Sequence, residues 1–269
     1  MRLLCATDLS SRADRALRRA ALLAGGTGAE LVLLTVAEAD AARARAGLEA
    51  QAAALGLPAS RLRVELGAPR EVIPRVAAEE EAALVVLGAH ERRPLRDLFG
   101  ATTAGEVMRR GPAPVLMVAR PAAGPHARVL AALDLSAPAL GALQAARGLG
   151  LLAGAELLAF HAFDLPARGH MLLGDMPEEA LSVQVAALEA RARDALLAQL
   201  AGVAPEAAPV LEQGPPAQAL RRAVDRLAPD LVVIGTRGHG ALGRLVLGSV
   251  AEEALRTLPC DVLAVPPAG

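Results

Sequence analysis

The chain repeats itself, and this internal repeat limits its fold more than any other feature does. The segment "DLSSRADRALRRAALLAGGTGAEL" from Asp8 matches "DLSAPALGALQAARGLGLLAGAEL" from Asp134, at the opening Asp-Leu-Ser and again at the closing Gly-Ala-Glu-Leu. Later on, "GAPREV" matches "GPPAQA", and "EVMRRGPAPVLMV" from Glu106 matches "EALRTLPCDVLAV" from Glu253. The sequence therefore predicts two copies of one unit.

The second copy is the longer one. The offset between the copies is 126 residues at the start (Asp8 to Asp134) and 147 at the later matches (Glu106 to Glu253), so the second copy carries 21 extra residues. We place them in "FDLPARGHMLLGDMPEEALSV", residues 163–183. This insertion follows the second predicted strand of its copy, so we interpret it as a lid over a ligand.

The two copies meet near "RPAAGPH", residues 120–126, where Pro and Gly are typical of a linker. We predict one domain over residues 1–121 and a second over residues 126–269.

Each copy alternates short apolar runs with Ala/Leu/Arg segments of helical period, which predicts an α/β fold with crossover helices. Near-continuous apolar runs such as "LVVIG" are typical of parallel strands buried on both faces. We therefore expect two tandem five-stranded parallel sheets of Rossmann-like type. The predicted strands are Arg2–Thr7, Glu30–Val36, Leu62–Leu66, Ala83–Gly88 and Val115–Ala119, then Arg128–Leu133, Glu156–Ala162, Pro209–Glu212, Leu231–Gly235 and Val262–Val265.

The carboxyl ends of the first and fourth strands are the expected ligand site. In open parallel sheets a ligand binds at this edge, at the point where the strand order reverses. In the second copy these two strands lead into Asp134 and Gly235.

A glycine pattern follows the fourth strand of the second copy. It consists of Gly235, two residues, Gly238, nine residues, Gly248 and Ser249. Glycines allow backbone amides to approach an anion, and the helix that follows presents free N–H groups that favour phosphate. As an alternative without ligand, Ser249 and Glu252 fit a capping box. The spacing alone does not choose between the two.

Composition excludes several classes of function. The chain has no Lys, so it has no Walker-type phosphate loop and no Schiff-base lysine. It has 28 basic and 29 acidic residues, no Tyr or Trp and three Phe, so we expect no nucleic-acid partner. Apolar stretches such as "LVLLTVA" are far shorter than the roughly 20 residues that span a bilayer, so we expect no membrane contact and a cytoplasmic protein.

Several of these features together resemble the universal stress protein family in its tandem form, over nearly the full chain. They are the strand followed by "DLS", the "GAP/GPPA" turn, and the long glycine pattern followed by "EEALRTLPCDVLAV". The glycine pattern is typical of the ATP-binding branch of that family. The resemblance implies a five-stranded α/β fold, usually dimeric, that binds ATP at the ends of the first and fourth strands. We accordingly expect a homodimer or an intramolecular pseudo-dimer.

The resemblance also implies roles for residues of the second copy. Asp134 would bind the ribose or the adenine edge, with Ala132 and Leu133 beside it. Ala162 and Phe163, at the end of the second strand, would form the wall of the adenine pocket.

The phosphates would lie on the glycine pattern. The phosphate-binding residues implied by the resemblance are Gly235, Gly238, Gly248 and Ser249, with Ile234, Arg237, His239 and Val250 as neighbours. Arg237 and Arg244 are the nearby cations that could offset triphosphate charge. We expect Mg²⁺ to accompany ATP, held mostly by phosphate oxygens and water.

The first copy departs from this pattern. It has Glu91 in place of the second glycine, and Ala101 and Thr102 in place of the Gly-Ser pair. A carboxylate about 4 Å from a phosphate oxygen repels it by about 4 kcal/mol at an effective dielectric of 20. Thr103 and Glu106 also fit a capping box of their own. We expect this copy to bind ATP poorly or not at all.

Other chemistry has weak support. The insertion and its flanks carry acidic and histidine side chains whose spacing matches no metal motif, so we expect no metal site; they are His161, Asp164, His170, Asp175, Glu178 and Glu179. No G-x-S-x-G elbow, Cys–His arrangement or HExxH motif is present, and we expect the two cysteines to be buried. ATP hydrolysis, if any, would be slow and would result from positioning alone.

Three functional hypotheses remain. The first is an ATP-binding stress-response regulator. The second is an ATPase or nucleotidyl transferase. The third is an assembly protein without ligand that associates through the edges of its sheets, at the fifth strands. The glycine pattern favours the first.

Overall fold

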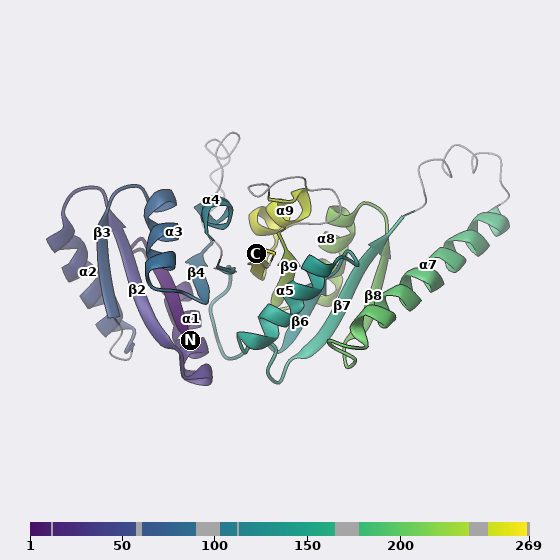
Figure 1. Cartoon of the computed structure of the whole chain (residues 1–269), viewed down its shortest axis with the longest axis horizontal. Coiled ribbons are helices and arrows are strands. Elements are labelled where there is room, and N and C mark those ends of the chain that lie inside the picture. Colours follow the sequence, from purple (N-terminus) through teal and green to yellow (C-terminus); the bar gives the residue numbers. More distant parts are fainter. Residues whose placement is uncertain are drawn as a thin grey trace.

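The computed structural model describes residues 1–11, 13–57, 61–89, 103–111, 113–164, 178–236 and 247–267. Within these residues the strands form a single ten-stranded sheet in the order β3-β2-β1-β4-β5-β10-β9-β6-β7-β8 (Figure 1). The strands of the first copy are β1 (Arg2–Thr7), β2 (Glu30–Ala37), β3 (Arg61–Leu66), β4 (Leu84–Gly88) and β5 (Val115–Val118). Those of the second copy are β6 (Arg128–Ala132), β7 (Glu156–Phe163), β8 (Ala208–Gln213), β9 (Leu231–Gly235) and β10 (Asp261–Val265).

Helices cover both faces of the sheet. One face packs against α1 (Asp14–Thr27), α2 (Ala41–Ala54), α5 (Ala137–Gly148) and α7 (Glu178–Leu200). The other face packs against α3 (Pro69–Glu79), α4 (Thr103–Arg110), α8 (Pro216–Leu227) and α9 (Ser249–Thr257). Successive residues of β1 enter opposite core clusters, Leu3 and Cys5 on one side and Leu4 on the other. This burial on both faces confirms the α/β fold expected from the apolar runs.

The predicted strands lie where the sequence places them, and no strand end differs from the prediction by more than one residue. Leu133 and Ala119, predicted as strand residues, lie one residue beyond β6 and β5. All strand pairs within each copy are parallel, as expected.

The two copies join along their fifth strands. β5 pairs with β10 in antiparallel register, at Met117↔Val262, Leu116↔Leu263 and Val115↔Ala264. Beside this seam, a Cβ atom at Gly150 would lie 2.7 Å from the Thr27 Cγ2 atom, so the segment after α5 packs closely on the end of α1. The two fifth strands are therefore paired with each other inside one chain. This is an intramolecular pseudo-dimer, one of the two arrangements that we expected. The third hypothesis proposed that separate chains associate through these edges. Because β5 and β10 already pair within one chain, neither edge is available for such an association.

The insertion of the second copy lengthens a helix. α7 has 23 residues, against 14 in α2, the corresponding helix of the first copy. In Figure 1, the first turns of α7 project beyond the sheet, on the side far from α9. They therefore do not cover the carboxyl ends of β6 and β9. The rest of the predicted lid, residues 165–177, lies outside the described residues.

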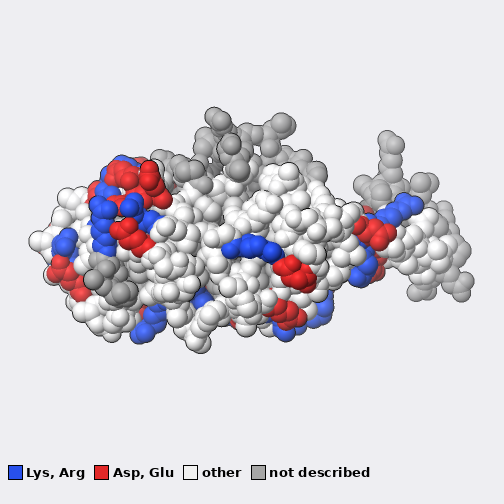
Figure 2. Space-filling view, turned by 60° about the horizontal axis from the view of Figure 1, so that its bottom comes forward, with Lys and Arg blue, Asp and Glu red and all other residues white. Residues whose placement is uncertain are grey.

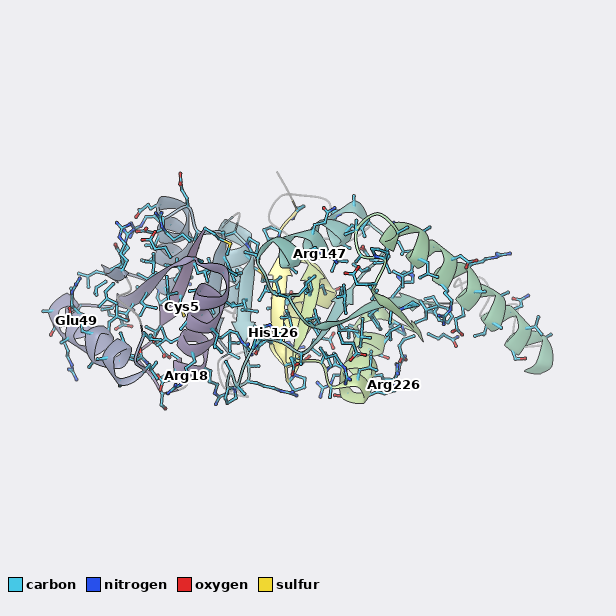
Figure 3. All side chains as sticks on the ribbon, turned by 90° about the horizontal axis from the view of Figure 1, so that it is seen from below. Cys5, Arg18, Glu49, His126, Arg147 and Arg226 are labelled. Carbon is cyan, nitrogen blue, oxygen red and sulfur yellow. The ribbon has the colours of Figure 1, made fainter. Side chains whose placement is uncertain are left out.

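A cluster of buried polar and charged groups surrounds Asp261, the first residue of β10, at the contact between the two copies. Its carboxylate is fully buried and accepts hydrogen bonds from the backbone N–H groups of Ala119 (2.9 Å) and Arg120 (3.3 Å). The Nε2 atom of His126 lies 3.1 Å from Asp261 Oδ2, and Arg19 Nε of α1 lies 3.2 Å from the same oxygen. His126 lies in the middle of the molecule in Figure 3. One carboxylate thus holds a helix of the first copy, the segment between the copies and a strand of the second.

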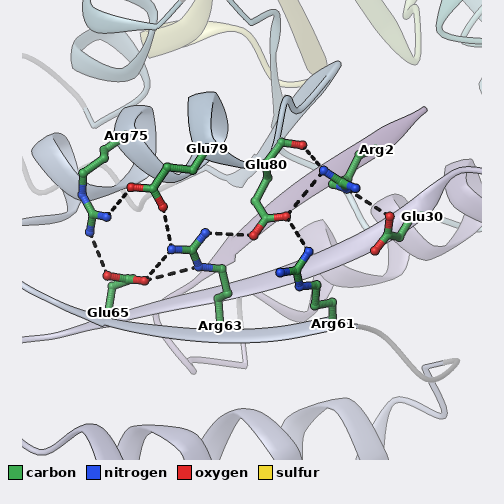
Figure 4. A network of polar contacts seen from close by, with 8 residues as sticks. All are labelled: Arg2, Glu30, Arg61, Arg63, Glu65, Arg75, Glu79 and Glu80. Atoms are coloured by element: carbon green, nitrogen blue, oxygen red, sulfur yellow. Dashed lines mark hydrogen bonds and ion pairs between the residues drawn. The ribbon is translucent and has the colours of Figure 1, made fainter.

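A second network of charges lies in the first copy, near the edge of the sheet where β1 and β3 begin (Figure 4). The Glu80 side chain, only 4% exposed, contacts Arg63 (2.8 Å), Arg61 (3.1 Å) and Arg2 (3.7 Å). These contacts tie the end of α3 to the first residues of β1 and β3. In the view of Figure 2, acidic and basic side chains are interspersed, and no large surface of one sign is visible.

Replacing Arg19 by Met should lower the free energy of unfolding by about 3 kcal/mol, because Asp261 then stays buried with one cation fewer. Urea unfolding followed by circular dichroism measures this loss. Arg18→Met is the matched control, since Arg18 is exposed on the same helix. Equal effects of the two changes would contradict the role of the buried cluster.

Replacing Glu65 by Gln should reduce the loss of stability in acid. Hydrogen bonds from Arg75 and Arg63 lower the pKa of Glu65. A carboxylate with a lowered folded-state pKa stabilises the fold above its unfolded-state pKa, near 4.3, and this contribution disappears as the pH falls through the folded-state value. The difference in unfolding free energy between pH 7 and pH 3.5 should therefore be smaller in Glu65→Gln. Glu38→Gln, at an exposed position, should retain the wild-type difference.

Candidate functional site

The strand register brings the predicted site residues to one edge of the sheet. Ala132 of β6 pairs with Phe160 of β7 on one side and with Ile234 of β9 on the other. Asp134, Ala162 and Thr236 each follow these paired residues by two positions. They therefore share the carboxyl edge of the three neighbouring strands, at the place where ligands bind in sheets of this kind.

Asp134 forms a tight turn with the two residues after it. Its Oδ1 atom accepts hydrogen bonds from the Ser136 backbone N–H (3.1 Å) and from the Ser136 hydroxyl (2.5 Å). Leu135, between them, has a φ of 62°, in the left-handed region that residues with a Cβ rarely adopt. Ser136 is also the N-cap of α5, where its Oγ accepts the N–H of Ala139 at 3.3 Å. The turn thus connects the site carboxylate rigidly to the start of a helix.

The first copy builds the same turn from the same three residue types. Asp8 Oδ1 accepts hydrogen bonds from the N–H (3.0 Å) and hydroxyl (2.5 Å) of Ser10, and Leu9 also has a φ of 62°. A backbone strain that occurs in both copies is a feature of the repeated unit, and strain of this kind is often found at functional sites.

The predicted wall of the site divides into exposed and buried parts. Ala132, Ala162 and Phe163 are half-buried at the ends of their strands. The side chains of Leu133 and Ile234 are 3% and 5% exposed and belong to the two core clusters on opposite faces. Only the backbone of these two residues can therefore contact a ligand.

The end of β9 and the start of α9 are joined by a backbone hydrogen bond. The N–H of Gly248 donates to the Thr236 carbonyl at 2.8 Å. A Cβ atom at position 248 would lie 3.3 Å from the same carbonyl oxygen, which explains why glycine suits this position. Gly235 and Gly248 of the glycine pattern are thus brought close together. Arg237, Gly238, His239 and Arg244, which stand between them in the sequence, lie outside the described residues.

The predicted capping box at Ser249 is wrong. The N-cap of α9 is Gly248, with extended φ and ψ of −63° and 145°, so Ser249 is the first residue of the helix. A capping box needs its serine at the N-cap itself. The Ser249 side chain is exposed at the first turn of α9, while Val250 is half-buried against the core. The alternative without ligand that the sequence left open for Ser249 is therefore removed.

The corresponding part of the first copy is only partly described. β4 ends at the half-buried Gly88, which matches Gly235. Glu91, Ala101 and Thr102 lie outside the described residues. α4 begins at Thr103, so Thr103 is a helical residue rather than the N-cap that the second predicted capping box requires.

Two side chains near the site make hydrogen bonds that the sequence did not indicate. His161 Nδ1 lies 2.8 Å from the Leu133 carbonyl oxygen, and the Gln199 side-chain N–H donates to the Leu135 carbonyl at 2.6 Å. In the sequence, His161 stands out only as one of the acidic and histidine side chains weighed as a metal site. A comparison of the two copies could have indicated this hydrogen bond, because Thr35, another side chain that can donate one, stands in the first copy at the position of His161.

The described residues form neither a metal site nor a reactive thiol. Within the described residues, no three His, Cys, Asp or Glu side chains come together as a metal site. Both cysteines are buried; burial raises the pKa of Cys5, and it is also the largest effect that raises the pKa of Cys260, to about 12. These thiols therefore stay protonated and unreactive. None of the described helices is long and apolar enough to cross a membrane.

Comparison with known proteins agrees with this architecture. The model of the universal stress protein family matches residues 1–49, 37–119 and 126–266, so it matches both copies. The chain belongs to the universal stress protein family. A universal stress protein from Thermus aquaticus is 38% identical over 138 residues, which are 51% of this chain and 96% of that protein.

Solved structures extend the similarity to the whole chain. A functionally unknown protein from Pseudomonas aeruginosa PAO1 is 25% identical and superposes with a TM-score of 0.70, covering 99% of this chain and 92% of that one. A universal stress protein from Archaeoglobus fulgidus is 19% identical with a TM-score of 0.64, covering 99% and 98% of the two chains, and shows the shared fold.

Replacing Ser136 by Ala should lower the free energy of unfolding by about 1 kcal/mol, because α5 loses its N-cap. The change also removes one hydrogen bond from Asp134. Urea unfolding measures the loss, and Ser11→Ala, at an exposed turn position before α1, is the control. A loss of the same size in the control would show that the turn at Asp134 contributes nothing special.

Proposed function

We propose that this universal stress protein binds ATP with Mg²⁺ in its second copy and acts as a cytoplasmic stress-response regulator whose nucleotide state controls partner proteins. The adenosine part lies at the carboxyl ends of β6 and β7, against Asp134, Ala162 and Phe163. The phosphates lie between the end of β9 and the first turn of α9. The first copy supplies mainly structure.

The observation that carries the proposal is the joining of Gly248 to Thr236. This bond of 2.8 Å holds the first turn of α9 at the end of β9, next to the strand that ends in the Asp134 turn. The first N–H groups of a helix and the positive end of its dipole favour a phosphate. The exposed Ser249 hydroxyl adds a donor at the same place. Anion donors and a carboxylate suited to a ribose hydroxyl are thus at neighbouring strand ends.

Mg²⁺ fits this site only as a companion of the nucleotide. The described residues hold no cluster of carboxylates for a dedicated metal site. Mg²⁺ commonly keeps several waters and binds phosphate oxygens through few protein ligands. The protein then has to position the phosphates, and the glycine pattern provides for this.

A regulatory role suits the site better than fast catalysis. The Asp134 carboxylate accepts two hydrogen bonds from Ser136, which hold it as a rigid acceptor. Positioning of the phosphates alone supports only slow hydrolysis. We therefore assign to the site binding of ATP with at most slow hydrolysis.

The test is a thermal and calorimetric titration with ATP and Mg²⁺. Binding at 100 times Kd should stabilise the wild-type chain by about 2.7 kcal/mol. Gly248→Val places a branched side chain against the Thr236 carbonyl and should abolish this stabilisation. Gly202→Val, in an exposed turn with open space around it, and Gly88→Val in the first copy should both retain it.

Two outcomes would contradict the proposal. One is a wild-type chain whose melting temperature does not respond to ATP, together with no adenine nucleotide in mass spectra of ligand released from the purified protein. The other is an equal response in Gly248→Val and wild type. Steady phosphate or pyrophosphate release that depends on Asp134 would instead favour the enzyme hypothesis.

A further inference from the structure

The backbone around Asp134 is held from behind by two side chains. His161 of β7 contacts the carbonyl of Leu133, one residue before Asp134, at 2.8 Å. Gln199 of α7 contacts the carbonyl of Leu135, one residue after Asp134, at 2.6 Å. Neither bond involves the Asp134 side chain, so both act on the direction of the turn itself.

The chemistry of these contacts determines which atom carries the hydrogen. A backbone carbonyl only accepts, so His161 Nδ1 and the Gln199 amide nitrogen are the donors. The remaining oxygen of Gln199, Oε1, is buried and has no hydrogen-bond partner among the described residues. A buried acceptor without a partner destabilises the folded state. The polar contact of Gln199 that the structure shows is therefore the bond that its nitrogen donates to the turn.

The first copy repeats this arrangement with partly different residues. The Thr35 hydroxyl donates to the Thr7 carbonyl at 3.0 Å, and Thr35 and Thr7 match His161 and Leu133. Gln51 of α2, the helix that corresponds to α7, donates to the carbonyl of Ser10 at 3.2 Å, one residue further along the turn than the acceptor of Gln199. Both copies thus keep a side-chain donor on the carbonyl before the aspartate, although one copy uses threonine and the other histidine. The repeated element is the donor and not the residue type.

The orphan oxygen of Gln199 has a clear origin. In the first copy, Gln51 Oε1 accepts a hydrogen bond from the Thr7 hydroxyl at 2.9 Å, and its nitrogen also donates to Asp14 at 2.8 Å. Leu133 and Leu140 stand at the matching positions of the second copy. The second copy has leucine at both positions, and its glutamine bonds to the strained Leu135.

We infer that His161 and Gln199 are positioning residues of the proposed nucleotide site, which hold the Asp134 carboxylate in its binding direction by fixing the carbonyls on either side of it. The inference rests on the proposed function. Successive side chains of a strand point to opposite faces, and Ala162 packs against the core cluster of α8 and α9, so His161 faces the α5 and α7 side. His161 therefore acts through the backbone and does not line the wall formed by Ala162.

The test compares His161→Thr with His161→Val. The two replacements have the same shape and differ in the hydroxyl that Thr35 uses for this bond in the first copy. His161→Val should weaken ATP binding about tenfold, as expected from the loss of one hydrogen bond, and His161→Thr should recover most of it. In the chain without ATP, hydrogen exchange of the Ser136 N–H, which bonds to Asp134, should be faster in His161→Val than in His161→Thr.

Gln199 is tested in the same way. Gln199→Met keeps the length of the side chain and removes the donor to Leu135, so it should also weaken ATP binding and accelerate exchange at Ser136. Gln184→Met is the matched control, because Gln184 is exposed on the same helix, and it should leave both quantities unchanged.

Equal ATP affinity and equal Ser136 exchange in His161→Val and His161→Thr would overturn the inference. A wild-type chain that fails to bind ATP would overturn the proposed function instead. The exchange rates are measured without nucleotide, so they decide the positioning role of His161 and Gln199 in either case.

Discussion

The antiparallel pairing of β5 with β10 is the contact on which the rest of the structure depends. It turns two five-stranded sheets into one ten-stranded sheet and removes the two strand edges that would otherwise be exposed in the middle of the molecule. Asp261, at the start of β10, reinforces this seam by accepting hydrogen bonds from the chain that leaves β5. Since the corresponding position in the first copy is Pro114, this carboxylate serves the pairing of two different copies within one chain.

The same asymmetry extends to the site. Both copies keep the Asp-Leu-Ser turn with its left-handed leucine, and both place a donor on the carbonyl before the aspartate. Only the second copy has the full glycine pattern, and its Gly248 brings the start of α9 to the end of β9. The duplicated unit thus provides a common frame, and the two copies differ in a few residues after their fourth strands.

The parts of the fold that could be predicted depend on local patterns. Strands such as β9 are buried on both faces, so the apolar run "LVVIG" alone marks their position. The cap of α9 could not be predicted in this way, because Ser249 and Glu252 satisfy the capping pattern and the path of the chain at Thr236 moves the N-cap to Gly248. His161 and Gln199 were missed as donors because their acceptors belong to a turn 28 and 64 residues away.

The sequence by itself determined the duplication, the ten strands and the position of Asp8 and Asp134 after the first strand of each copy, because hydrophobic periodicity acts over a few residues. Only the tertiary structure decided that the fifth strands pair with each other, that Asp261 meets Arg19 and His126 in the core, and that two distant donors hold the turn at Asp134. All of these contacts join segments that are far apart in the chain. The first two form only once the two copies have packed together, and the third only once the second copy has folded.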